Sequence, residues 1–159
     1  VLSTLHTNDA PAAVTRMLDL GLPSYLISAT VLGVMAQRLV RVLCPSCKKS
    51  TPATAEDEAM WDRLVAPWKA NRPSQFHQPV GCLDCRMTGY RGRVGIYEIL
   101  MLSPDMKQAI SDNADVAKIR DLAYREGMKP LRISGAMKVA AGVTTLAEVF
   151  KVAPPSERA

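Results

Sequence analysis

The four cysteines of the chain form two pairs with the same internal spacing. "CPSCKKS" contains Cys44 and Cys47, and "GCLDC" contains Cys82 and Cys85. Zinc in structural sites takes four soft ligands in a tetrahedron, and each C-x-x-C turn can supply two thiolates to one ion. Two such turns fill the coordination shell and leave no open position, so we expect one structural Zn²⁺ bound by all four cysteines.

The alternatives to a metal site are free cysteines in a core and two redox-active pairs. A redox C-x-x-C usually begins a helix in a thioredoxin-like unit, and the sequence around these cysteines shows no such pattern. A disulfide scaffold is not expected either, because four cysteines in 159 residues are too sparse for one. The spacing therefore favours metal binding.

The basic residues gather in two acid-free stretches that flank the cysteine pairs, in a chain of net charge +5. The stretches run over residues 20–55 and 85–97 and contain Arg38, Arg41, Lys48 and Lys49, then Arg86, Arg91 and Arg93. A basic surface attracts the phosphates of nucleic acids or of anionic lipid headgroups. An ordinary solvated face explains the same pattern equally well.

Length and composition indicate one globular domain in an aqueous compartment. The chain has 159 residues, of which 48% are hydrophobic and 22% charged. Its longest apolar stretch, residues 25–36, is shorter than the roughly 20 residues that a membrane-spanning helix needs. The sequence opens without a signal-peptide pattern, so we expect a cytoplasmic protein.

The hydrophobic pattern predicts the elements that lead into the first cysteine pair. Residues 1–5 resemble a buried strand, and a helix capped by Asn8 or Asp9 follows and ends at Gly21. A second helix is predicted over residues 24–35. A strand over residues 38–44 then leads into the cysteines.

Residues 48–81 are predicted to leave the core and return at the second pair, so that the metal ties both ends of this excursion to one point. The excursion contains a helix capped by Thr54 and a loop over residues 69–79. A strand is predicted over residues 94–100. Helices follow, with caps at Ser103 and Asp115, a stop at Gly142, and a capping box from Thr145 to Glu148.

No phosphate-binding loop is present in the sequence. That motif, G-x-x-x-x-G-K-[ST], uses backbone amides and a lysine to bind nucleotide phosphates. None of the nine glycines is followed directly by Lys-Ser or Lys-Thr. We therefore expect that this chain alone does not bind a nucleotide.

Four segments together resemble the type II secretion and type IV pilus assembly ATPases, the family of general secretion pathway protein E. They are "VLSTLHTNDAPAAVTRMLDLG", "AQRLVRVLCPSCK", "GCLDCRMTGYRGRVGIYEIL" and "GMKPLRISGAMKVAAGVTTLAEV", in this order along the chain. Only residues 50–79 show no specific resemblance. The resemblance implies the C-terminal portion of such an ATPase.

The resemblance also implies an α/β fold: the C-terminal part of a RecA-like ATPase core, an inserted tetracysteine zinc module and a small C-terminal helical subdomain. Residues 1–43 would be the distal part of the core and residues 44–85 the zinc-binding insertion. Residues 86–102 would return to the core, and residues 103–159 would form the helical subdomain.

In this family such a chain would belong to a hexameric ATPase that couples ATP hydrolysis to pseudopilus or pilus assembly in protein secretion. Three residues match catalytic positions by resemblance. His6 lies in "STLHTN", the family's histidine box after a strand, and would act near the γ-phosphate, while Arg16 and Arg38 match arginines of the family pattern. From the residues alone, the alternatives are that His6 is a loop histidine bonded to backbone and that each arginine forms a structural ion pair.

ATP and Mg²⁺ would be bound mainly by upstream residues that this chain lacks, so the fragment is expected to be inactive alone. The implied partners are identical subunits in a homo-hexamer, inner-membrane secretion platform proteins and anionic lipid headgroups, at the cytoplasmic face of the inner membrane. The alternative is a zinc-ribbon module that binds nucleic acid. Such modules interleave aromatic with basic residues, and only Tyr90 lies near the second cysteine pair, which argues against nucleic acid.

Overall fold

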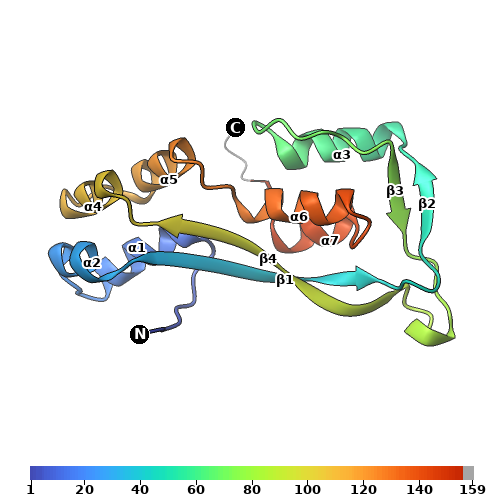
Figure 1. Ribbon diagram of the computed structural model, residues 1–159, viewed down its shortest axis with the longest axis horizontal. Helices are drawn as coiled ribbons and strands as arrows, with labels where there is room; N and C mark the ends of the chain where they lie inside the picture. The colour runs from blue at the N-terminus through green and yellow to red at the C-terminus, as the bar shows by residue number, and fades with distance from the viewer. Residues whose placement is uncertain (156–159) are drawn as a thin grey trace. The chain divides into compact units, whose positions relative to one another are not determined.

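The computed structural model describes residues 1–155, and their contacts divide the chain into two compact units. Unit 1 combines Val1–Gln37 with Tyr97–Pro130, and unit 2 combines Arg38–Ile96 with the segment from Leu131 onward. Two long paired strands, β1 (Gly33–Leu43) and β4 (Tyr90–Met101), contribute residues to both units (Figure 1).

The β1–β4 pair is antiparallel. The amide of Leu102 donates to the carbonyl of Leu32 at 3.1 Å, and the amide of Cys44 donates to the carbonyl of Gly89 at 2.9 Å. Early residues of one strand thus face late residues of the other, and the two arrows in Figure 1 point in opposite directions. Both predicted strands are confirmed, and both are longer than the sequence indicated.

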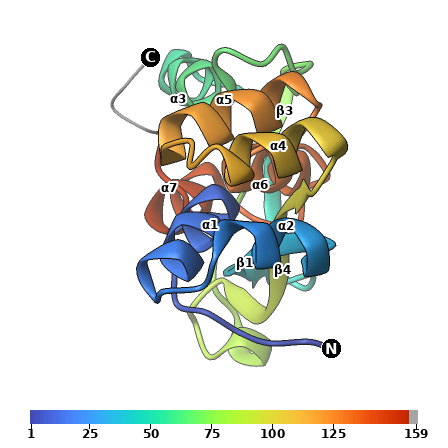
Figure 2. The same ribbon diagram turned by 90° about the vertical axis from the view of Figure 1, so that its left-hand side faces the viewer.

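Unit 1 contains four helices, α1 (Ala10–Asp19), α2 (Ser24–Thr30), α4 (Pro104–Ser111) and α5 (Val116–Arg125). The caps at Asp9, Ser103 and Asp115 are confirmed, because each side chain accepts a hydrogen bond from a first-turn amide. Helix α1 packs on α5 and α2 packs on α4, as Figure 2 shows. The core between them consists of side chains that are almost fully buried, namely Val14, Ile27, Met106, Ile110 and Ile119.

Two sequence-based predictions in unit 1 are wrong. Residues 1–5 form no strand and are exposed, because no strand among the described residues pairs with them. The helix predicted over residues 24–35 ends at Thr30, and β1 begins at Gly33. β-Branched Thr30 and Val31 disfavour further helix, and a Cβ on Gly33 would lie only 3.0 Å from the carbonyl oxygen of Leu100 on the partner strand.

Unit 2 contains a small two-stranded sheet and three α-helices. Strands β2 (Lys49–Pro52) and β3 (Gln75–Gln78) are antiparallel. Helix α3 (Ala55–Val65) lies between them in sequence, and α6 (Leu131–Ala140) and α7 (Leu146–Val152) complete the unit. Helix α3 packs on α6 and α7.

The predicted excursion, residues 48–81, packs into the core of unit 2 instead of leaving it, because α3 contacts α6 and α7. Thr54 caps α3 as predicted, and Trp61 and Leu64 are buried. The prediction of a loop over residues 69–79 is wrong at β3, because Phe76 is 2% exposed and its ring centroid lies 6.1 Å from that of Trp61. Strand β3 thus depends on a long-range aromatic contact that local sequence does not reveal.

The compact units follow a different division from the four segments implied by the resemblance. The segment 44–85 lies entirely in unit 2. The segment 103–159 is divided, since α4 and α5 belong to unit 1 whereas α6 and α7 belong to unit 2. Residues 156–159 lie outside the described residues.

Candidate metal centre

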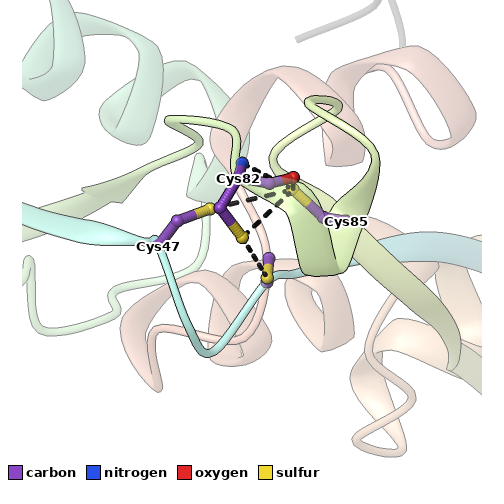
Figure 3. A group of neighbouring side chains, drawn as sticks. Cys47, Cys82 and Cys85 are labelled. Atoms are coloured by element: carbon purple, nitrogen blue, oxygen red, sulfur yellow. Dashed lines mark hydrogen bonds between the residues drawn. The ribbon is translucent and has the colours of Figure 1, made fainter.

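The four cysteines lie together in unit 2. Cys44 directly follows β1, and Cys47 ends the turn after it. Cys82 and Cys85 belong to a short 3₁₀ turn, η1 (Leu83–Cys85), with Cys82 as its cap. All four Sγ atoms lie within 4.8 Å of one another, and Figure 3 shows Cys47, Cys82 and Cys85 turned toward a common point. The predicted grouping of the four cysteines is confirmed.

The distances between the sulfurs match a tetrahedral zinc site. The Sγ atoms of Cys44 and Cys82 are 3.8 Å apart, those of Cys47 and Cys85 3.9 Å, and those of Cys82 and Cys85 3.8 Å. With Zn–S bonds of about 2.3 Å, the edge of a regular tetrahedron is about 3.8 Å. No pair is close enough for a disulfide, whose S–S bond is about 2.05 Å. The donor set therefore fits Zn²⁺.

Backbone amides point at the sulfurs. The amide of Gly81 donates to Cys47 Sγ at 3.3 Å, and the amides of Cys82 and Gly89 each donate to Cys85 Sγ at 3.2 Å. Such donors stabilise thiolates, the form of cysteine that binds a metal. The site thus has the outer hydrogen bonds that orient ligands before an ion binds.

The thiols differ in proton affinity. Burial raises the pKa of Cys85, but the amide donors of Cys82 and Gly89 outweigh it and lower that pKa to about 6. A backbone hydrogen bond with Cys85 lowers the pKa of Cys82, but burial and the neighbouring thiols outweigh it and raise that pKa to about 11. Cys85 is therefore the first thiolate of the cluster, and a bound cation would deprotonate the others.

The site is closed. Cys44 and Cys85 are buried and Cys47 and Cys82 are half-buried. Among residues 1–155, no other group of three or more histidine, cysteine or acidic side chains is placed to bind a metal ion. Four thiolates leave no position for a water or a substrate, which is typical of a structural rather than a catalytic metal.

A polar network next to the cysteines connects β1, β4 and α7, and the sequence-based reasoning missed it. Nη2 of Arg41 lies 2.5 Å from a carboxylate oxygen of Glu148, and the guanidinium lies 4.0 Å from the ring centroid of Tyr90. The Tyr90 hydroxyl is 3.1 Å from Oγ1 of Thr145. The hydroxyl of Thr144 donates to the Arg41 carbonyl at 2.7 Å.

The predicted capping box from Thr145 to Glu148 is only half present. Thr145 does cap α7, since its hydroxyl accepts from the Glu148 amide. The Glu148 carboxylate, however, accepts from the amide and the guanidinium of Arg41. The hydrogen bond from Arg41 holds the pKa of Glu148 below its usual value, and the same bond raises the pKa of Arg41. Arg41 and Glu148 are over 100 residues apart in sequence, so no local sequence pattern indicated that they form an ion pair.

The three residues with implied catalytic roles do not share one unit. His6 follows the exposed first residues and is itself exposed, and Arg16 is exposed in the last turn of α1. Both belong to unit 1, whereas Arg38 is half-buried on β1 in unit 2. Their catalytic roles remain predictions.

The turn that carries His6 has defined support. The amide of Ala10 donates to a carboxylate oxygen of Glu98 at 2.9 Å, and Glu98 is 3% exposed. Asp9 accepts from the Ala12 amide at 2.8 Å and from Arg120 on α5 at 2.7 Å. These contacts fix the cap of α1, Asp9, three residues after His6.

The fold and the site define a two-unit α/β chain with a preformed, closed tetrathiolate centre. The chain matches the family model for "Type II/IV secretion system protein" over residues 1–151. The chain belongs to this family, as the resemblance predicted.

Curated relatives agree with this assignment. The chain is 49% identical to the type IV pilus assembly ATPase TfpB of Acinetobacter baylyi, over 97% of this chain and 26% of the relative. It is 46% identical to the type IV pilus assembly ATPase PilB of Myxococcus xanthus, over 94% of this chain and 26% of the relative. It is 43% identical to type II secretion system protein E of Pseudomonas aeruginosa, over 96% of this chain and 29% of the relative. The chain thus spans between a quarter and a third of these relatives' length.

Two further observations bear on the class of protein. Within residues 1–155, no helix has the length and apolar content to cross a bilayer. Tyr90, the aromatic side chain nearest the second cysteine pair, has its ring occupied by Arg41.

Proposed function

We propose that this chain is the C-terminal part of a hexameric secretion ATPase that couples ATP hydrolysis to pseudopilus or pilus assembly. One observation carries this proposal: relatives named as secretion or pilus assembly ATPases match 94–97% of the chain at 43–49% identity. The substrate class is ATP. The residues that bind ATP and Mg²⁺ would belong mainly to the upstream part of the protein, with a RecA-like core as the implied fold.

In this proposal the cysteines bind a structural Zn²⁺. The ion supplies a cross-link between the end of β1 and the start of β4, and no chemistry on ATP. Cys44 and Cys47 hold it from one side, and Cys82 and Cys85 from the other. The sulfur spacing of 3.8–3.9 Å between pairs supports this role.

His6, Arg16 and Arg38 are the proposed contributions of this chain to ATP hydrolysis. Phosphoryl transfer depends mainly on positioning and on charge stabilisation. An exposed imidazole on a turn that Asp9 and Glu98 support is suited to contact the γ-phosphate or the attacking water. An exposed guanidinium at Arg16 is suited to reach a phosphate or a neighbouring subunit.

The proposed partners are identical subunits, platform proteins of the inner membrane and anionic lipid headgroups, with the protein at the cytoplasmic face of that membrane. The exposed basic residues of unit 2 support contact with an acidic surface.

The proposal is tested by steady-state ATP hydrolysis with the full-length protein as a purified hexamer. His6→Ala should lower kcat by about 10²–10³-fold, the usual cost of losing one transition-state contact, while nucleotide affinity and zinc content stay unchanged. His77→Ala is the matched control, because His77 lies in β3 of unit 2. Parental kcat in His6→Ala would show that His6 is an ordinary loop histidine, and a full-length protein without ATPase activity would refute the function itself.

The same proposal predicts that the 159-residue chain alone does not bind ATP, because it lacks a phosphate-binding loop. Titration calorimetry with ATP should show no heat of binding at micromolar concentrations. Tight binding by this chain would contradict the proposed division of the site.

A further inference from the structure

An acidic side chain is buried beside the start of α1. Among the described residues of unit 1, Glu98 is the one acid that is buried, with 3% of its surface exposed. It lies on β4 on the same face as the buried Leu100, because alternate residues of a strand share a face. A carboxyl group loses its hydration on burial, so the fold must supply hydrogen bonds in return. The contacts of Glu98 therefore indicate its role.

Glu98 accepts a hydrogen bond from the amide of Ala10, the first residue of α1, at 2.9 Å. The first amides of an α-helix have no partner within the helix. Ala10 is fully buried, so water does not replace this acceptor. The carboxylate of Glu98 thus holds the first residue of α1 against β4.

The helix does not need Glu98 for its cap. Asp9 is the N-cap and accepts from the Ala12 amide at 2.8 Å, and Pro11 has no amide hydrogen to satisfy. Of the acceptors in this first turn, Glu98 is the one that belongs to another element. Its role is therefore to attach the helix start to β4 rather than to begin the helix.

The attachment reaches His6 through a short turn. The hydroxyl of Thr7 donates to the carbonyl of Asp9 at 3.1 Å, which closes the backbone between His6 and Ala10. Consecutive Cα atoms are about 3.8 Å apart, so the chain between these two residues has little slack. A shift of Ala10 would move the imidazole of His6 with it.

A second contact holds the same turn less firmly. Arg120 on α5 donates to the Asp9 carboxylate at 2.7 Å, but the two side chains are 33% and 26% exposed. Solvent weakens an ion pair at such a position. The bond to Glu98 is buried, so Glu98 is the stronger anchor of the turn.

We propose that Glu98 is a positioning residue for His6. By holding the start of α1 on β4, it keeps the imidazole where it contacts the γ-phosphate or the attacking water. The inference rests on the proposed function, which assigns that contact to His6. A misplacement of about 1 Å costs a rate about 10²-fold, so an anchor four residues from the imidazole controls kcat.

The test is steady-state ATP hydrolysis by the full-length hexamer with two matched variants. Glu98→Met has a similar length but no acceptor for the amide, whereas Glu98→Gln retains a carbonyl oxygen. Glu98→Met should lower kcat by about 10–10²-fold with KM for ATP unchanged, and Glu98→Gln should retain most of the parental kcat. Asp19→Ala is the control, because Asp19 is an exposed acid at the other end of α1.

A double variant separates positioning from a general structural role. If Glu98 acts through His6, Glu98→Met should lower kcat little further once His6→Ala is present, because interacting residues are not additive. If Glu98 only stabilises the fold, the two losses in kcat multiply. Multiplied losses would overturn the inference.

Hydrogen exchange of the full-length protein tests the contact without ATP hydrolysis. In Glu98→Met, peptides that cover residues 7–13 should lose protection, whereas Glu98→Gln and Asp19→Ala should exchange as the parent does. Parental exchange in Glu98→Met would overturn the inference. If Glu98→Met does not assemble, Glu98→Asp takes its place, since it withdraws the acceptor by one methylene. It should lower both protection and kcat, and parental values of both would overturn the inference.

The outcomes for this inference and for the proposed function are distinct. A low kcat in His6→Ala together with parental kcat in Glu98→Met refutes this inference alone. Equal losses of kcat in Glu98→Met and Glu98→Gln refute it too, because the acceptor would then not matter. A parent without ATP hydrolysis refutes the proposed function, and parental kcat in His6→Ala refutes the role of His6; either result overturns the positioning role as well.

Discussion

Removal of the metal should loosen residues 80–87 and leave most of the excursion, residues 48–81, folded. A cross-link between Cys47 and Cys82 would close a loop of about 36 residues, which in the chain-entropy treatment of covalent cross-links is worth about 4 kcal/mol. If only the metal organised residues 48–81, Cys82→Ser would release all of them. The structure indicates a smaller effect.

The reason is that other contacts already close this loop. Lys49 pairs with Gln78 in the β2–β3 ladder, so the chain returns close to the cysteines without the ion. Trp61, Leu64 and Phe76 are each at most 2% exposed, and full burial of such side chains is worth about 1.5–3 kcal/mol apiece. Their total of about 4–9 kcal/mol, an upper estimate because the unfolded chain also buries surface, is of the same order as the loss of the cross-link.

Hydrogen exchange monitored by mass spectrometry would check this. In Cys82→Ser, amides of residues 44–48 and 79–89 should lose protection, among them that of Gly89, which donates to Cys85 Sγ. Amides of α3 and of α5 should exchange at parental rates. Ser74→Ala, a surface substitution within the excursion, is the control. If α3 exchanges as fast as residues 80–87, the metal rather than the burial of Trp61, Leu64 and Phe76 holds the excursion, and the reasoning above is wrong.

Two further predictions concern unit 2. Glu148→Gln should lower the free energy of unfolding by about 1–2 kcal/mol at pH 7, a value reduced for the half-exposed Arg41, whereas the exposed Glu56→Gln should change it little. Because the folded pKa of Glu148 is lowered, the ionised carboxylate contributes fully above the unfolded pKa, near 4.3, and its contribution is lost as the pH falls through the folded pKa. Urea unfolding at pH 7 and at a pH below the folded pKa should therefore show that the parent and Glu148→Gln differ less in unfolding free energy at the lower pH. An equal difference at the two pH values would refute the contribution of the Arg41–Glu148 ion pair. Gly135→Ala should destabilise by about 1–3 kcal/mol, because its Cβ would lie 2.4 Å from a methyl of Val149; an unchanged melting temperature would show that α7 shifts freely.

The features that the sequence determined are local. The four cysteines could be grouped because each C-x-x-C turn presents two sulfurs whatever the surrounding fold, and the structure confirms their proximity. The helix starts at Asp9, Thr54, Ser103 and Asp115 could be placed because a cap needs only a side-chain acceptor and an amide up to three residues away. The family could be recognised for the same reason, since its motifs are short and contiguous.

The features that only the tertiary structure decided depend on partners far along the chain. Residues 1–5 have the composition of a strand, but a strand requires a neighbour to pair with, and none of the described residues provides one. Strand β3 has little strand signal, yet it forms because Phe76 packs against Trp61. Glu148 lies at a capping-box position, but its carboxylate binds Arg41 instead. The guanidinium and the backbone amide of Arg41 together donate two hydrogen bonds to it, whereas a capping box would supply one backbone amide. Short-range hydrogen bonds can be predicted from the local sequence. Strand pairing and side-chain burial depend on which distant segment packs against the residue.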